Sequence, residues 1–248
     1  MKRRSLLASG VAAALLPSRA LAFGDAATVD IAEIDLGPGT IARPGAWGRL
    51  LFEMIQTTSV VCNTEVQRFS LDNSELFEHP FVVIVGNAAV TPPSDDAIEK
   101  LGRYLSYGGM LLIDDSTGVD NGPFDVSMRN LLARLFPTRP LAPLPPDHSV
   151  FRSFFLLNRA DGRIDRSPWL DAVTVGTFSP VIFMRNDLSG ALDRSQSGAD
   201  VNACVPGGEG QRREAIKLGI NLMMYALTAD YKRDIAHVRQ LMIDGRFE

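Results

Sequence analysis

The chain has 248 residues, of which 46% are hydrophobic and 22% are charged. This length fits an α/β domain with a substantial core, and the composition excludes a disordered chain or a fibrous repeat. Two cysteines exclude a disulfide scaffold and a thiolate-rich zinc site, and three histidines leave little room for histidine-based chemistry. We therefore expect neither a metal ion nor another cofactor.

The first 22 residues have the pattern of an export signal. Three cations at positions 2–4 precede an apolar stretch at 6–16, and Ala20-Leu21-Ala22 is a small-x-small cleavage pattern. The apolar stretch is too short to span a bilayer. We expect cleavage after Ala22 and a mature protein in the periplasm.

The paired Arg3 and Arg4, followed by Ser5-Leu6-Leu7, resemble the twin-arginine motif that directs export of folded proteins. Export through the Sec pathway is the alternative, but Arg19 is a charge that Sec signals tend to avoid near the cleavage site. Removal of the four cations of the signal leaves 21 cations and 29 anions, a net charge of −8. Such an acidic domain has no electrostatic reason to bind nucleic acid, and no other segment looks like a membrane span.

The first third of the mature chain predicts strands and one helix. Residues 29–36 alternate apolar and polar side chains, which predicts an edge strand with one face in solvent. Residues 46–56 carry an apolar stripe at helical spacing, and residues 66–71 predict a second short strand. Residues 81–85 are an unbroken apolar run, which is typical of a strand buried on both faces of a parallel sheet.

The next segments continue the alternation of strands and helices. Ser94 is a candidate N-cap for a helix that ends near Gly108-Gly109, and residues 110–113 predict another buried strand. A helix with one apolar face follows at 128–136. The order predicts an α/β fold, flavodoxin-like in size, with a doubly wound, mostly parallel sheet and helices on both faces. No glycine-rich phosphate-binding motif supports a nucleotide site.

The last part of the chain is less regular until its final helix. Residues 137–170 are rich in proline and extended, and two strands are expected at 172–177 and 180–185. A loop is expected at 188–208. The helix expected at 209–227 is apolar nearly all round, so it should be buried against the sheet. We expect residues 23–248 to form a single domain with a polar tail.

Four segments have a familiar sequence and order: 107–115 (YGGMLLIDD), 144–152 (LPPDHSVFR), 185–189 (RNDLS) and 213–232. Together they resemble an uncharacterised bacterial family known as domain of unknown function 4159. Ser149 departs from that pattern, in which Pro is usual. The resemblance implies a fold like that of class I glutamine amidotransferases and implies no activity. Many family members resemble large membrane-anchored proteins, which suggests a membrane-anchored protein complex as the partner.

Amidotransferase chemistry itself is not expected. It needs a nucleophilic cysteine on a sharp turn after a buried strand, and the residues at 86–89 are Gly, Asn, Ala and Ala. Cys62 and Cys204 lie elsewhere in the chain, and the sequence leaves open whether they pair or stay free.

Asp114, Asp115 and Ser116 are the best candidates for a site because ligands of open α/β sheets lie beyond the carboxyl ends of the strands. The two carboxylates either hold a cation or work as an acid–base pair, or they cap loops. Since successive strand residues face opposite sides, we expect Asp114 to be buried and to cap backbone. Asp115 is expected to face the cleft.

Asp147 and His148 follow a rigid Pro145-Pro146 pair, which could aim the imidazole back over the sheet. We expect His148 to share one cleft with Asp114 and Asp115; a surface position or a role at a helix end is the alternative.

Other polar and aromatic residues have a structural and a functional reading. Arg129 and Arg152 either bind an anion, pair with Asp114 or Asp115, or form ordinary salt bridges. Asn221 is expected to satisfy buried backbone groups. Three aromatic residues are expected in the core: Trp47, Trp169 and Tyr225.

The sequence favours an exported, non-catalytic binding or interaction domain. The alternative is a hydrolase or a small-ligand-binding protein that uses Asp114, Asp115 and His148.

Overall fold

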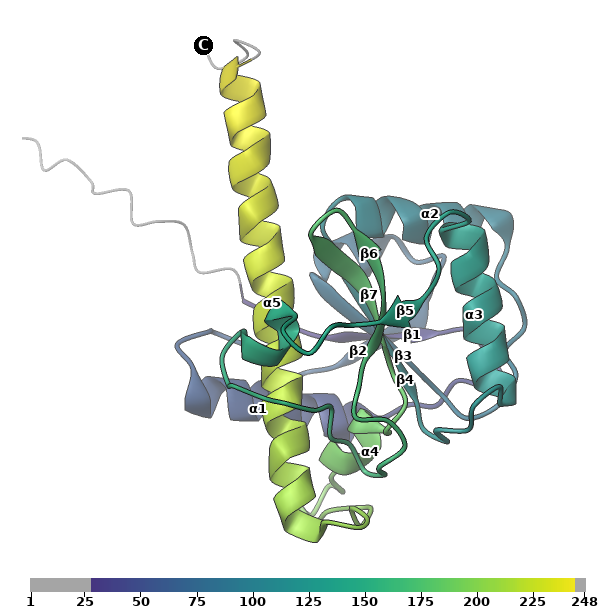
Figure 1. Cartoon of the computed structure of the whole chain (residues 1–248), viewed down its shortest axis with the longest axis vertical. Helices are drawn as coiled ribbons and strands as arrows, with labels where there is room; N and C mark the ends of the chain where they lie inside the picture. Colours follow the sequence, from purple (N-terminus) through teal and green to yellow (C-terminus); the bar gives the residue numbers. More distant parts are fainter. Residues whose placement is uncertain (1–27, 244–248) are drawn as a thin grey trace, which may run out of the picture.

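A computed structural model describes residues 28–243, with side chains through Thr228. The expected signal sequence at 1–22 lies outside the described residues. The described part is α/β, with seven strands in one sheet (Figure 1). The strands are β1 (Ala32–Asp35), β2 (Gln67–Ser70), β3 (Phe81–Gly86), β4 (Met110–Asp115), β5 (Ala142–Pro143), β6 (Asp171–Val175) and β7 (Phe178–Met184). The helices are α1 (Pro44–Thr57), α2 (Asp95–Ser106), α3 (Pro123–Leu135), α4 (Leu188–Leu192) and α5 (Gly208–Ile243), with short 3-10 helices η1 (Ser74–Glu78) and η2 (Ser149–Arg152).

The sheet has the order β2-β1-β3-β4-β7-β6-β5 and is mostly parallel. Its first five strands run parallel and follow the flavodoxin-like order, with β7 in the place of the fifth strand. Only β6 runs opposite to the direction of the other strands, so it is antiparallel to both β5 and β7. A short turn joins β6 to β7, which makes this pair antiparallel. The fold class expected from the sequence is therefore confirmed.

The prediction that the first strand lies at the edge is wrong. β1 lies between β2 and β3, and Glu33, whose charge suggested a wet face, is only 2% exposed. Its carboxylate accepts hydrogen bonds from the Trp47 indole at 2.9 Å and the Arg43 backbone N–H at 2.6 Å, and it pairs with Arg68. These partners allow a charged residue inside the sheet, which an alternating pattern cannot reveal.

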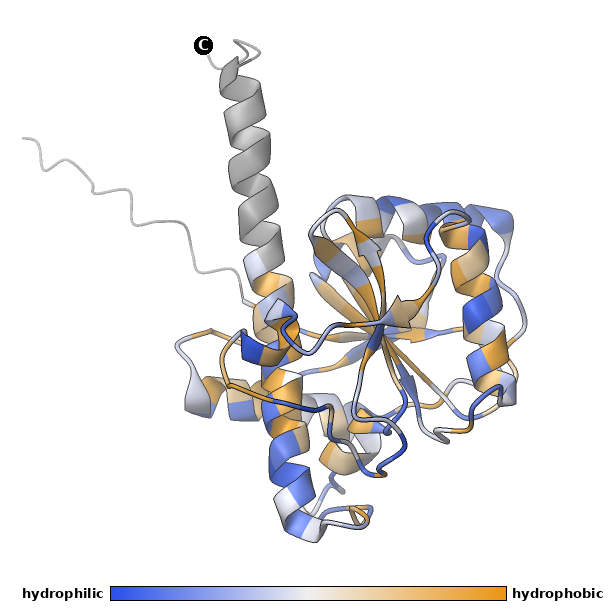
Figure 2. Cartoon of the chain, in the orientation of Figure 1, coloured by the Kyte–Doolittle hydropathy of each residue, from blue (hydrophilic) through white to orange (hydrophobic). Residues whose placement is uncertain are grey.

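Helices cover both faces of the sheet, as the sequence predicts. One face packs against α1, α4 and α5, and the other packs against α2 and α3 (Figure 1). In β3, Val83 and Val85 face the first layer, while Val82 and Ile84 face the second. The all-apolar runs of β3 and β4 follow from this burial on both sides (Figure 2). Ser94 caps α2 as expected, since its hydroxyl accepts the Ala97 N–H at 3.2 Å.

The last helix is longer than its apolar run. The residues of α5 from Ala215 to Ala226 are largely buried against the sheet and α1, as expected, but the helix continues to Ile243. Asn221 lies within the buried part and is fully buried. Its amide nitrogen donates to the carbonyls of Val150 and Phe155, each at 2.9 Å, which confirms its expected role. The segment expected to be a loop at 188–208 contains α4.

None of the helices within residues 28–243 combines the length and the apolarity needed to cross a membrane.

Candidate functional site

The usual ligand crevice of this strand order is filled by the chain itself. The order reverses between β1 and β3, and the loop after β1 pairs with the end of β3 there. Ile41 N–H donates to the Val85 carbonyl at 2.9 Å, and Asn87 N–H donates to the Gly39 carbonyl at 3.0 Å. Gly39 has φ +99°, and a Cβ on it would lie 2.3 Å from the Ala89 carbonyl oxygen. The loop after β1 therefore packs directly on the end of β3 at the place where the strand order reverses.

Asp114 is buried and caps backbone, as the sequence predicts. It lies at the carboxyl end of β4 and is 0% exposed. Its two oxygens accept the N–H groups of Leu188 at 2.9 Å and Ser189 at 2.7 Å, which are the first residues of α4. The buried Ser189 hydroxyl also lies close to this carboxylate but forms no full hydrogen bond. Asp114 therefore anchors the start of α4 to the central sheet.

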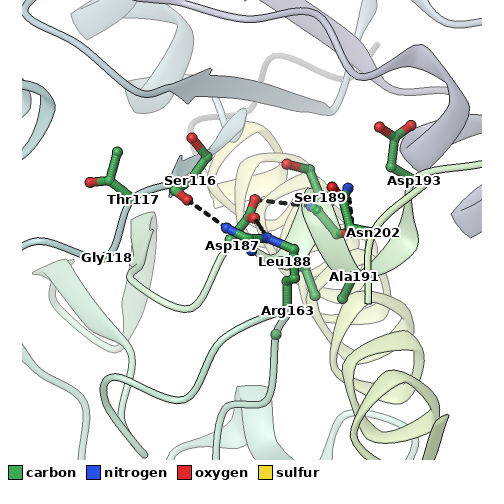
Figure 3. A network of polar contacts seen from close by, with 12 residues as sticks. Ser116, Thr117, Gly118, Arg163, Asp187, Leu188, Ser189, Ala191, Asp193 and Asn202 are labelled. Atoms are coloured by element: carbon green, nitrogen blue, oxygen red, sulfur yellow. Dashed lines mark hydrogen bonds and ion pairs between the residues drawn. The ribbon is translucent and has the colours of Figure 1, made fainter. Parts of the chain in front are cut away.

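A second buried carboxylate lies beside the first. Asp187 follows β7, has φ +54° and accepts the Gly190 N–H at 3.0 Å. It forms an ion pair with Arg163 (Figure 3). A guanidinium nitrogen of Arg43 lies 3.8 Å from its carboxylate. Burial and the Asp187 charge raise the pKa of Asp114 to about 7, against the effect of the hydrogen bonds from α4.

The prediction that Asp115 faces an open cleft is wrong. Its side chain is 1% exposed, and Oδ1 accepts the backbone N–H groups of Thr117 at 2.9 Å and Gly118 at 3.2 Å. Ser116 is also buried, and its hydroxyl donates to the Gly86 carbonyl at 3.0 Å. Because β4 turns sharply after Asp115, the carboxylate is used to close that turn. Both aspartates therefore hold backbone.

His148 lies at the opposite end of the sheet from Asp114, so the prediction of one shared cleft is wrong. Asp114 pairs in register with Met184 at the end of β7. The His148 Nε2 atom lies 3.4 Å from the hydroxyl of Ser179, near the start of β7. These two positions are five residue steps apart along β7, which is roughly 16 Å.

The local chain explains the position of His148. Its N–H donates to the Pro145 carbonyl at 2.9 Å, so the two prolines do turn the chain back over the sheet. The ring then packs against Tyr225 with centroids 5.3 Å apart, and Nδ1 accepts the Val150 N–H at 3.2 Å at the start of η2. Burial lowers the pKa of His148, and the exposed Asp147 opposes that effect. The anion that acts on His148 is thus Asp147.

The two candidate arginines lie apart. Arg152 is exposed in η2, the element that His148 caps. Arg129 in α3 forms a salt bridge with Asp125 one turn earlier at 3.0 Å, and it also reaches Asp171 at 3.6 Å. The salt-bridge reading of Arg129 is therefore correct.

Arg129 also lines a pocket of about 450 Å³ at the carboxyl edge of the sheet, on the side of α3. We call it the carboxyl-edge pocket. The loop after β4, the helix α3, the segment before β6 and the end of β7 each contribute to its wall. The polar and aromatic residues that matter most for its chemistry are Asp120, Asp125, Arg129, Trp169, Asp171 and Arg185.

The charged groups of this pocket are held by each other and by one aromatic ring. Arg185 pairs with Asp171 at 2.9 Å and with the exposed Asp120. The guanidinium carbons of Arg129 and Arg185 lie 5.8 and 5.6 Å from the centroid of the Phe183 ring. Burial lowers the pKa of Arg185, but the hydrogen bond and charge of Asp171 outweigh it and raise the pKa overall. The side chains of Arg129 and Arg185 are therefore held in place before any ligand arrives.

Sequence reasoning missed most of this pocket and misplaced one of its residues. Trp47 and Tyr225 are core residues as expected, at 0% and 5% exposure, but Trp169 is 40% exposed and lines the pocket. One signal was present in the sequence: the polar run at 185–187 directly follows an apolar strand. That run ends at the same edge as Asp114 and supplies both Arg185 and Asp187.

The fold defines an α/β protein with a flavodoxin-like strand order, and its polar residues gather at the carboxyl edge of β4 and β7. The chain belongs to the family described as a domain of unknown function (DUF4159), whose profile matches residues 30–227. No curated protein sequence matches the chain significantly. Within the part that the structure describes, no cluster of three or more metal-binding side chains occurs.

Proposed function

We propose that this chain is an exported, periplasmic, non-catalytic binding domain whose ligand site is the carboxyl-edge pocket. One observation carries the proposal: the pocket combines paired arginine and aspartate side chains with an exposed indole, while the buried carboxylates of Asp114 and Asp115 accept backbone N–H groups. A pocket of this size falls in the range of small-molecule sites. We propose that the ligand-bound protein then binds a membrane-anchored protein assembly. We do not propose a nucleic acid as its partner.

The thiols give no support to a catalytic reading. Burial raises the pKa of Cys62 and of Cys204, which disfavours the reactive thiolate, and both cysteines are free. A relationship to the class I amidotransferase fold remains part of the proposal, supported by the strand order. The hydrolase alternative loses its stated residues, because His148 is far from Asp114, and it becomes an outcome of the test.

Ligand binding without turnover is the expected behaviour of the purified protein. In a thermal-shift screen of sugars, nucleotides, amino acids and dicarboxylates, a ligand of the pocket should raise the melting temperature because it binds only the folded state. Trp169→Ala should abolish the shift, since it removes the exposed wall of the pocket. Arg103→Gln is the matched control, because Arg103 is exposed on α2 and lies outside the pocket wall.

Product analysis of the same mixtures completes the test. The ligand should be recovered unchanged. Conversion of the ligand to product would establish an enzyme, and a shift that survives Trp169→Ala would place the site elsewhere.

Export is the second part of the proposal and concerns residues outside the described range. Replacing Arg3-Arg4 by Lys-Lys should retain the protein in the cytoplasm, because the twin-arginine machinery distinguishes the two side chains. Cell fractionation measures this, and N-terminal sequencing of the exported wild type should begin at Phe23. Arg19→Lys is the control with the same chemical change outside the pair. Normal export of the Lys-Lys variant would indicate the Sec pathway.

A further inference from the structure

We propose that the ligand of the carboxyl-edge pocket is a carbohydrate whose ring stacks on Trp169 and whose hydroxyls bind the guanidinium and carboxylate groups of the wall. The inference rests on the proposed function, because it names the ligand class of the same pocket. It is carried by the charge balance of the wall, the exposure of one indole and the rigidity of the segment that holds it.

The wall of the pocket is balanced in charge. It contains three guanidinium and three carboxylate groups: Arg129, Arg166, Arg185, Asp120, Asp125 and Asp171. A multiply charged anion would meet three carboxylates, and a multiply charged cation would meet three guanidinium groups. A hydroxyl, in contrast, donates to a carboxylate and accepts from a guanidinium at the same time. The wall therefore suits a neutral ligand with many hydroxyls.

Trp169 supplies the apolar surface that such a ligand needs. The chain has 2 tryptophans; Trp47 is fully buried, whereas Trp169 is 40% exposed beside these charged groups. An indole is a flat, mostly apolar surface, and leaving it in water forfeits the free energy of its burial. The C–H face of a sugar ring is also apolar, and its rim carries the hydroxyls. Stacking on Trp169 thus leaves the hydroxyls free to reach the charged wall.

The segment that carries Trp169 is held in place before binding. The Asn186 side chain accepts the backbone N–H groups of Arg166 at 2.8 Å and Ser167 at 3.0 Å, and it donates to the Ser167 carbonyl at 2.5 Å. Ser167 Oγ accepts the backbone N–H of Trp169 at 3.2 Å and donates to the backbone carbonyl of Trp169 at 3.1 Å. Asn186 is itself 1% exposed. Binding therefore does not have to order the backbone that carries the indole, which favours affinity for a small, weakly interacting ligand.

The guanidinium groups also keep donors available. An arginine side chain has five N–H donors. Arg129 and Arg185 use some of them on Asp125, Asp171 and Asp120. The hydrogens that remain project from groups already fixed over the Phe183 ring. Together with the lone pairs of the carboxylates, they give the same wall both hydrogen-bond donors and acceptors.

An array of neutral, amino and uronic-acid oligosaccharides, probed with the purified protein, tests the inference. We expect at least one class to bind, and its titration should change the intrinsic fluorescence, because Trp169 is the exposed one of the two tryptophans. Trp169→Ala should weaken binding roughly tenfold or more, and Trp169→Phe should restore part of it because the ring remains. Asp120→Asn should weaken binding by a smaller factor, since the Asp120 side chain is 80% exposed and contacts only part of the ligand.

Controls separate the loss of binding from the loss of folding. Arg103→Gln should bind as the wild type does, and the melting temperature of each variant should stay within a few degrees of it, because the replaced side chains are exposed. Unchanged binding by Trp169→Ala would overturn the stacking geometry.

The ligand classes of the screen distinguish failure of this inference from failure of the proposed function. Binding of a nucleotide or a dicarboxylate in the pocket, with no saccharide bound, would overturn the carbohydrate assignment and leave the binding function intact. If no small molecule of any class binds in a Trp169-dependent way, both proposals are wrong.

Discussion

Replacing Leu222 by Asp is expected to unfold the protein or to lower its free energy of unfolding by about 4 kcal/mol or more. Leu222 is 0% exposed in α5, within the core layer formed with α1 and α4. A carboxylate at this position would be buried among apolar side chains without a partner, and the cavity left by the leucine would add to the penalty.

Thermal and urea denaturation of the purified protein measure this effect. Arg213→Asp is the matched control, because it introduces the same side chain on an exposed position of the same helix. That variant should stay within about 0.5 kcal/mol of the wild type. A Leu222→Asp protein that melts within a degree or two of the wild type would contradict the placement of α5.

Asp114 is expected to make the stability of the protein fall as the pH rises from about 4 to about 7. Its pKa is raised from 3.8 to about 7 in the folded state. Below this window Asp114 is protonated in both the folded and the unfolded chain. Within the window the unfolded chain loses the proton while the folded chain keeps it. Deprotonation therefore stabilises only the unfolded state, and the free energy of unfolding falls. The loss is complete above about pH 7 and amounts to at most about 4 kcal/mol.

The comparison with Asp114→Asn isolates this contribution from those of other groups. The amide cannot ionise, but it replaces one oxygen that accepts an N–H of α4, so the variant carries a penalty of about 1–3 kcal/mol at every pH. The stability of the wild type relative to the variant should therefore be greatest near pH 4 and should fall by up to about 4 kcal/mol towards pH 7, which reverses its sign if the full loss occurs. Urea denaturation at several pH values measures it, and a difference independent of pH would contradict the raised pKa.

A titration of the Asp114 carboxyl carbon by NMR adds a direct measurement. In Asp187→Asn the neighbouring charge is removed, so the midpoint of Asp114 should move to lower pH. The same midpoint in both proteins would mean that burial alone sets the pKa.

The elements that the sequence predicted well are those whose signal is local. The apolar runs of β3 and β4 mark strands buried on both faces, and Ser94 marks the start of α2 with its own side chain. Asn221 could be assigned to buried backbone because a lone amide in an apolar helix has few other partners. In each case the residue and its neighbours in sequence contain the physical reason.

The errors concern residues whose environment comes from distant segments. The sequence predicted a solvated Glu33, but Trp47 and Arg68 contact its carboxylate in the fold. The His148 ring packs against Tyr225, which lies 77 positions later in the sequence. Trp169 was expected in the core because tryptophan side chains are usually buried there. In the fold it is 40% exposed and lines the carboxyl-edge pocket. No periodicity records such contacts.

The sequence by itself determined the class of fold, the family and the position of Asp114 at the carboxyl edge, since strand periodicity and order need only neighbours along the chain. Only the tertiary structure decided what that edge offers a ligand. The loop after β1 packs on the end of β3 at the expected crevice, and the first N–H groups of α4 donate to the Asp114 carboxylate. The carboxyl-edge pocket is lined by five parts of the chain, Pro143 of β5 among them, which meet only when β5, β6 and β7 are added to the parallel strands. Side-chain pairing across such distances depends on the complete fold, because each charge is stable there only once its partner has been placed.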